Sequence, residues 1–209
     1  MTITQISNGA PTVGTFANRL RLILISLALL SGGILAAIAQ DGHSHATPHR
    51  ELTPDQKPKA SELVKIVRDS TERFKDVHVA EAEGYTLQFG CVTGPDSGAM
   101  GLHYVNGDLV KRGELDPTHP QIVIYEPGSD GTLKLIGADF LLVADAWDKK
   151  NQGPPELMGQ LFHYWESPNR FGLPAFYTLH VWAWQSNPNG AFVNWHPNVS
   201  CQQFNPQTR

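Results

Sequence analysis

Charged residues and cysteines are scarce in this sequence. Only 17% of its 209 residues are charged, the formal net charge is -4, and no stretch is strongly basic. Nucleic acids and anionic membrane surfaces are bound chiefly through clustered Lys and Arg, so neither is expected as a partner. The 19 glycines and 15 prolines follow no collagen-like period, and an apolar fraction of 41% is too high for a disordered chain. The composition therefore predicts a folded domain.

The common catalytic motifs are also missing. The sequence has no His-Glu-x-x-His pair, no phosphate-binding loop ending in Gly-Lys-Ser/Thr, no Gly-x-Ser-x-Gly and no dinucleotide-binding fingerprint. Any site must therefore be built from residues that the fold brings together.

The first 39 residues have the pattern of an export signal. Two arginines precede an uncharged apolar run over residues 22–39, which ends in the small residues Ala37-Ile38-Ala39 that signal peptidases prefer. We expect cleavage after this run, so that 1–39 is a signal peptide; an uncleaved signal anchor, with residues 22–39 in the membrane, is the alternative. In both cases the rest of the chain is exported and is periplasmic or extracellular.

Export makes the two cysteines informative. Cys91 and Cys201 are the only ones, and neither belongs to a Cys-x-x-Cys motif. In an oxidising compartment a lone pair of cysteines most simply forms a disulfide. We therefore predict a Cys91–Cys201 bridge.

The exported part is predicted to be a tether followed by one α+β domain. Residues 40–60 are polar and contain several histidines and prolines, which is typical of a disordered tether. In the domain, residues 61–205, apolar residues at helical spacing predict one amphipathic helix from Ser61 to Gly84. Five short extended runs predict a curved, mainly antiparallel sheet, barrel-like or rolled, against which this helix packs. The runs are 85–92, 100–106, 121–126, 133–143 and 176–184, and residues 154–158 could begin one more short helix.

Two histidines in the middle of predicted strands form the candidate site. Strand alternation places both imidazoles on largely apolar surfaces, and Glu126 ends a neighbouring strand. Two neutral imidazoles and one carboxylate are a common ligand set for divalent iron, manganese, zinc or copper. The predicted metal ligands are His103, Glu126 and His180, with Asp139 and His163 as weaker candidates and with Tyr104, Trp182 and Trp184 lining the approach.

Other interpretations of these residues remain open. Each histidine could make one hydrogen bond in the core, Glu126 could cap the turn at Pro127-Gly128, and a metal-free pocket for a small organic molecule would have the same composition. The leading hypothesis is a cell-envelope protein that binds a divalent metal (Zn, Fe, Mn or Cu) or a small ligand. The alternatives are a metal-dependent enzyme of hydrolase or oxygenase type at the same site, and a metal-free interaction module with exposed aromatic residues.

Several strings of the sequence carry a resemblance to a known group. They are GAMGLHYVN at 98–106, LDP at 115–117, YEP at 125–127, LHVWAW at 179–184 and NVSC at 198–201. These strings resemble those of a family of uncharacterised exported bacterial proteins, over residues 61–202. The resemblance implies export and a single domain, and it draws attention to His103, Glu126 and His180.

Overall fold

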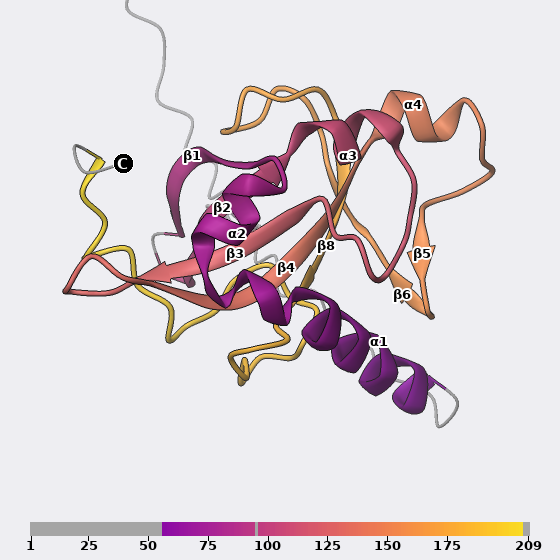
Figure 1. Ribbon diagram of the computed structural model, residues 1–209. Coiled ribbons are helices and arrows are strands. Elements are labelled where there is room, and N and C mark those ends of the chain that lie inside the picture. Colours follow the sequence, from indigo (N-terminus) through magenta and orange to yellow (C-terminus); the bar gives the residue numbers. More distant parts are fainter. Residues whose placement is uncertain (1–55, 95, 207–209) are drawn as a thin grey trace, which may run out of the picture. The chain divides into compact units, whose positions relative to one another are not determined.

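The computed structural model of the chain describes residues 56–94 and 96–206 (Figure 1). The predicted signal segment 1–39 and the predicted tether up to residue 55 lie outside these residues. All described residues belong to one compact unit. No helix within the described ranges has the length and apolar character needed to cross a membrane.

Two helices and a short 3-10 turn precede the sheet. They are α1 (Gln56–Thr71), η1 (Glu72–Lys75) and α2 (Val77–Ala82), so residues 56–60 of the predicted tether are helical. The prediction of a single uninterrupted helix is wrong because the chain breaks at Asp76, where the backbone is extended. The Asp76 side chain accepts a hydrogen bond from the N–H of His78 and thereby caps a new helix.

Six strands form one antiparallel sheet in the order β1-β2-β3-β4-β8-β7. All five predicted strands are present, and the predicted α+β class, with a helix packed on a curled sheet, is confirmed. The sixth strand has only three residues, too few for a periodic pattern that sequence analysis can detect. The strands are β1 (Tyr85–Gly94), β2 (Gly98–Asn106), β3 (Ile122–Pro127), β4 (Leu133–Val143), β7 (His163–Trp165) and β8 (Phe176–Val181).

Short elements fill the connections between these strands. Helix α3 (Gly107–Arg112) begins after Asn106, whose side chain accepts hydrogen bonds from two backbone N–H groups of the first turn. Helix α4 (Ala144–Asp148) directly follows β4. Both helices are too short to leave the amphipathic pattern from which a helix is usually predicted.

The predicted start of a helix at residues 154–158 is wrong. This segment enters a two-stranded ribbon, formed by β5 (Glu156–Leu157) and β6 (Gln160–Leu161). Met158 and Gly159 connect the two strands with left-handed backbone angles, φ 48° and 83°. Two consecutive residues with positive φ make a tight hairpin turn and are incompatible with an α-helix.

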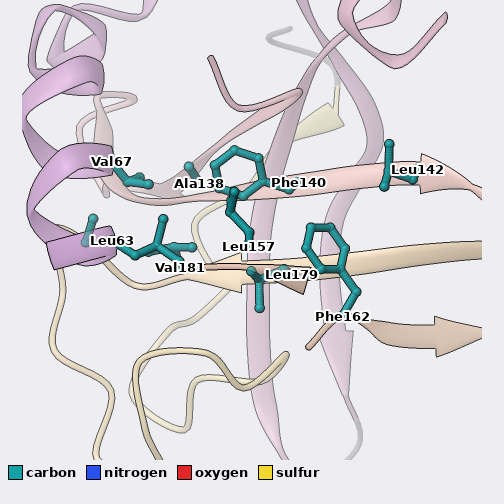
Figure 2. Packing of buried hydrophobic residues seen from close by; sticks show 10 residues of the cluster. Leu63, Val67, Ala138, Phe140, Leu142, Leu157, Phe162, Leu179 and Val181 are labelled. Carbon is teal, nitrogen blue, oxygen red and sulfur yellow. The ribbon is translucent and has the colours of Figure 1, made fainter. Parts of the chain in front are cut away.

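The helices cover one face of the sheet with a closed hydrophobic core. Figure 2 shows Leu63 and Val67 of α1 pointing at the aliphatic and aromatic side chains of β4 and β8, and both are fully buried. On the same face, the hydroxyl of Tyr125 in β3 donates a hydrogen bond of 2.7 Å to the Phe74 carbonyl of η1. This face of the sheet is therefore covered by side-chain packing.

The C-terminal segment covers the opposite face. His196 and Ala99 exchange two backbone hydrogen bonds, of 3.0 and 3.2 Å, which attach the segment to β2. The Cys91–Cys201 disulfide is confirmed, with Cα atoms 5.7 Å apart, and it joins the same segment to β1. Ile122, Ile124 and Trp182 pack into the layer between sheet and segment. The buried polar residues described next lie in this layer.

Candidate metal centre

His103, Asp139 and His180 come together from three different strands, β2, β4 and β8. Each offers one ligand atom that lies within 4.8 Å of those of the other two. Their side chains are buried, with exposed fractions of 6%, 2% and 2%. Within the part of the chain that the structure describes, this is the one cluster of three or more His, Cys, Asp or Glu side chains with the geometry to hold a metal ion.

Strand register brings Asp139 next to His180, and the curl of the sheet brings His103 close to both. Asp139 lies directly opposite His180 in the β4–β8 pair, so the two side chains share a face. His103 lies opposite Ile124 of β3, the strand that separates β2 from β4. In a flat sheet, two strand spacings alone would separate β2 from β4 by about 9.5 Å. Asp139 is also two residues from Gly137, the residue of β4 in register with His103. The side chains meet because the sheet curls toward this face.

Asp139 is fixed by a hydroxyl group. The Thr178 hydroxyl donates a hydrogen bond of 2.6 Å to Asp139 Oδ1. His180 Nδ1 lies 3.6 Å from the same oxygen, which is beyond hydrogen-bond distance. Burial raises the pKa of Asp139 to about 6, although the hydrogen bond from Thr178 and the proximity of His103 act to lower it. The carboxylate form therefore predominates at pH 7.

Both histidines are neutral at pH 7. Burial, assisted by repulsion from His180, lowers the pKa of His103 to about 4. Burial, assisted by repulsion from His163, lowers the pKa of His180 to about 3. His103 Nδ1 lies 3.2 Å from the carbonyl oxygen of Gly101, which can only accept, so Nδ1 carries the proton and Nε2 keeps its lone pair. A neutral imidazole with a free lone pair is the form that binds metals.

His180 lacks the partners that a buried imidazole normally has. Neither of its ring nitrogens has a hydrogen-bond partner among the described residues, and the nearby Asn194 Oδ1 is likewise buried and unpaired. Proximity to Asn194 opposes the lowering of the His180 pKa, but the two groups do not reach a hydrogen bond of normal geometry. Unpaired buried polar atoms destabilise a fold. Three of them in one place mark a position that a bound ion or ligand would stabilise.

A small cavity reaches this group. Its volume is about 30 Å³, which is room for about two water molecules. The cavity is polar where it meets His103, Asp139, His180 and Thr178. The rest of its lining is apolar and consists of Phe89, Met100, Leu141, Trp165, Phe171, Leu173 and Phe176.

Glu126, a ligand in the sequence prediction, lies outside the group. It is opposite Lys134 near the end of β3, and its Oε1 accepts a hydrogen bond of 3.0 Å from the N–H of Ser200. Glu126 therefore helps to hold the C-terminal segment on the sheet. The carboxylate that joins the two histidines is Asp139, which the sequence analysis ranked as a weaker candidate.

His163 lies near the group without belonging to it. It is opposite Thr178 in the β7–β8 pair, so it faces the same side of the sheet, and its Nε2 is 3.2 Å from the Phe192 carbonyl oxygen. The structure places it in the three-residue strand β7.

The three predicted pocket residues lie in different places. Trp182 packs beside His180, with ring centroids 5.9 Å apart, and its indole N–H donates to the Val193 carbonyl at 2.6 Å. Tyr104 lies in the core on the helix side of the sheet, and Trp184 lies under the Arg68 guanidinium on α1. None of the three belongs to the cavity lining.

Most residues of the cavity wall are not predictable from the sequence. Met100 should face away from His103 by strand alternation, but Val92 pairs with Gly101 and Thr93 with Ala99, so Met100 sits in a bulge and turns toward the cavity. A signal did exist for Thr178, which is two residues from His180 and therefore on the same strand face. The sequence gives no comparable signal for Asn194.

No family model matches the chain, and no curated protein or solved structure is significantly similar to it. The resemblance to exported bacterial proteins therefore stays a prediction. What the site does must be inferred from its own geometry.

Proposed function

We propose that this protein binds one divalent transition-metal ion through His103, Asp139 and His180. The observation that carries the proposal is the convergence of three buried ligand atoms within 4.8 Å, in a group where both nitrogens of His180 have no partner among the described residues. A metal ion would bind an imidazole nitrogen and the carboxylate at once, and it would stabilise groups that packing alone leaves unpaired.

The donor atoms define the class of metal. Two imidazole nitrogens and one carboxylate oxygen suit zinc, divalent iron, manganese and copper, whereas calcium and magnesium prefer sites built from oxygen ligands. Both cysteines are in the disulfide, so a thiolate does not take part. The set matches the metals proposed from the sequence, with Asp139 in the place of Glu126.

We also infer that the protein works outside the cytoplasm, in the periplasm or beyond the cell. The disulfide is consistent with an oxidising compartment, and the sequence of residues 1–39 is typical of an export signal. Mass spectrometry of the exported protein would then find a chain that begins at Gln40.

A metal-dependent enzyme is the second candidate function. Three protein ligands leave coordination positions open, and the cavity of about 30 Å³ gives water or a small molecule access to them. Asp139 is a ligand in this arrangement, so His163, which faces the same side of the sheet, would be the group to accept a proton. A metal held with an exchangeable water favours this candidate, whereas a metal coordinated by protein atoms alone favours storage or structural stabilisation.

The proposal is tested by titrating metal-free protein with Zn²⁺ in competition with a chelator. To remove competing ligands, His43, His45 and His49 are first replaced by alanine. We expect one tightly bound zinc per chain, and a loss of affinity of at least ~100-fold in His103→Ala and in His180→Ala, because loss of a direct ligand should cost more than loss of an outer-shell group.

His78→Ala is the matched control because the His78 side chain is 82% exposed and lies on α2. It should bind zinc like the parent protein, and circular dichroism should show an unchanged fold in every variant. Zinc affinity that does not differ between the site variants and this control would show that the proposed site is wrong.

A further inference from the structure

The wall of the cavity above the His103–Asp139–His180 group is almost entirely apolar. Four aromatic rings dominate it, and no Lys, Arg or Glu is present among the described residues that line it. Apart from the three candidate ligands, the lining has one hydroxyl group, that of Thr178, and it already donates to Asp139. Such a wall offers a bound molecule apolar contact and very few hydrogen bonds.

The four rings form one continuous surface although they come from distant parts of the chain. Trp165 of β7 stacks on Phe176 of β8, with centroids 6.0 Å apart. Phe171, between these strands, lies edge-on to Trp165 at 5.5 Å. Phe89 of β1 lies edge-on to Phe171, also at 5.5 Å. An aromatic surface assembled in this way can hold a ring-shaped molecule by offset or edge contacts.

Phe89 has features that core packing does not explain. Its backbone is left-handed, with φ 64°, and its side chain is 44% exposed. It lies in a bulge, since Gln88 pairs with His103 and Cys91 with Leu102, which leaves Phe89 and Gly90 outside the register. Left-handed conformations are rare for aromatic residues and cluster at binding and catalytic sites. In this bulge the strained residue carries its ring to the rim of the cavity.

We propose that the cavity admits a small, largely apolar molecule of about the size of one aromatic ring and without positive charge, which lies between the aromatic wall and the bound metal. This inference rests on the proposed function, which places a metal ion at the floor of the cavity. An organic cation would be repelled by the metal, whereas an alcohol or carboxylate oxygen on the ring would be attracted to it. Without the metal, an organic anion would meet the Asp139 carboxylate with no Lys or Arg in the lining to pair with. A sugar would leave most of its hydroxyl groups without partners.

The size of the cavity assigns a role to Phe89. The open volume of about 30 Å³ holds only about two water molecules, so a ring-sized molecule needs one wall to move. Because Phe89 is 44% exposed and its ring meets Phe171 edge-on, Phe89 can rotate outward without opening the core. Phe89 is therefore the residue that opens the entrance.

Three probes of matched size test the proposal on the full chain, both zinc-loaded and zinc-free. Benzyl alcohol, benzoate and benzylammonium each contain one ring and differ mainly in charge. Calorimetry and saturation-transfer NMR should show benzyl alcohol and benzoate binding to the zinc-loaded protein at least ~10-fold more tightly than benzylammonium, because the metal repels a cation. In the zinc-free protein benzoate should bind more weakly than benzyl alcohol, because its charge then has no partner. Equal or tighter binding of benzylammonium to the zinc-loaded protein, or no binding of any probe, would overturn the proposal.

Variants of the wall locate the binding. Phe171→Ser and Phe89→Gly should each weaken benzyl alcohol binding by about tenfold, since each removes a large apolar contact. Glycine adopts positive φ without steric cost, so Phe89→Gly keeps the fold even if Phe171→Ser does not. Tyr164→Ser is the control, because Tyr164 is 57% exposed and packs on Tyr177 away from the cavity. Identical binding in all three variants would overturn the assignment of this wall.

The same measurements separate this inference from the proposed function. A protein that takes up no zinc but still binds benzyl alcohol through Phe89 and Phe171 would disprove the metal site and leave an organic-ligand pocket. A protein that takes up zinc through His103 and His180 but binds benzylammonium as tightly as benzyl alcohol would keep the metal site and disprove the ligand class.

Discussion

A buried imidazole normally hydrogen-bonds through at least one nitrogen, and His180 departs from that pattern. Its neighbour Asn194 has an unpaired oxygen and is near enough to oppose the lowering of the His180 pKa. Histidines that bind metals usually donate their second N–H to such an oxygen, which fixes the tautomer and orients the ring. Asn194 is therefore the residue that we expect to position His180 when a metal is bound.

Replacing Asn194 with alanine should weaken zinc binding by about 10- to 100-fold, the usual effect of removing a group that orients a metal-binding histidine. The competition titration used for the ligand variants measures this directly. Asn151→Ala is the control. Asn151 is exposed in the loop after α4, and its side-chain amide donates a hydrogen bond to the Trp147 carbonyl of that helix. Unchanged zinc affinity in Asn194→Ala would show that Asn194 does not orient His180.

The pH dependence of zinc binding should reflect the perturbed pKa values of the ligands. Burial raises the pKa of Asp139 to about 6 and lowers that of His103 to about 4. Zinc binds the deprotonated ligands, so affinity should be constant above pH 7 and should fall by about tenfold per pH unit between pH 6 and 4, where one proton is displaced. Below pH 4 the fall should steepen as His103 also binds a proton.

Chelator competition at a series of pH values tests this order of titration. Two ordinary histidines would instead release two protons per zinc near pH 6.5, which gives a steeper and earlier loss of affinity. That result would contradict the burial argument for His103 and His180.

Single site residues are predictable from the sequence where the residues next to them in the chain form a clear pattern. A histidine in the middle of an apolar strand is unusual, and both His103 and His180 were found in this way. Glu126 was preferred over Asp139 although both lie in strands, because sequence does not show which strand positions meet across the sheet. The partner of Glu126 is the N–H of Ser200, 74 residues away, and no local pattern predicts that contact.

At the scale of secondary-structure elements, β2 positions the site because it carries a glycine where no side chain fits. Gly101 has φ 97°, and a Cβ atom there would lie 2.6 Å from the Tyr125 carbonyl oxygen of β3. The Gly101 carbonyl is also the acceptor for His103 Nδ1. The backbone of β2 at this point therefore sets both the close approach to β3 and the orientation of the His103 ring.

Gly101→Ala should lower the free energy of unfolding by about 2 kcal/mol or more, since the new methyl group meets backbone atoms and the positive φ is unfavourable for alanine. It should weaken zinc binding as well, because His103 moves with the strand. Gly107→Ala is the control: a Cβ atom at Gly107 meets nothing within 4 Å. Chemical denaturation and zinc titration of both variants provide the comparison, and equal behaviour would contradict this role for β2.

Elements were predictable where the pattern was long and regular. The eleven residues of β4 were predicted with the bounds that the structure has, because a continuous apolar run between turn residues is a strong strand signal. The helix was predicted without its break at Asp76, since the apolar spacing continues through it. The three-residue strand β7 carries too little pattern to be found, yet it supplies Trp165 to the cavity.

At the scale of the whole molecule, the curl of the sheet creates the site. The disulfide holds in place the C-terminal segment that covers this face of the sheet. Ligands from β2, β4 and β8 meet only because the sheet is curved, and curvature arises from twist and bulges summed over all strands. This property is spread over the whole sequence, so the separate strands could be predicted while the convergence of their side chains could not.

Removing the disulfide should destabilise the protein substantially. The bridge joins residues 110 positions apart, and loss of a native disulfide that closes so long a loop typically lowers the free energy of unfolding by about 2–5 kcal/mol. Denaturation of the Cys91→Ser/Cys201→Ser double variant measures this. Saturating zinc should recover part of the lost stability, about 2.7 kcal/mol at a concentration of 100 times Kd. A variant as stable as the parent would contradict the anchoring role of the bridge.

The most direct test of the central claim is the metal content of the exported protein, measured by elemental mass spectrometry after purification without an affinity tag. Two full-length forms are compared, both with His43, His45 and His49 replaced by alanine, and one of them also carrying His103→Ala and His180→Ala. We expect close to one transition-metal ion per chain in the first form and almost none in the second. Equal metal content in the two forms, or no metal in the first, would contradict a metal centre at His103, Asp139 and His180.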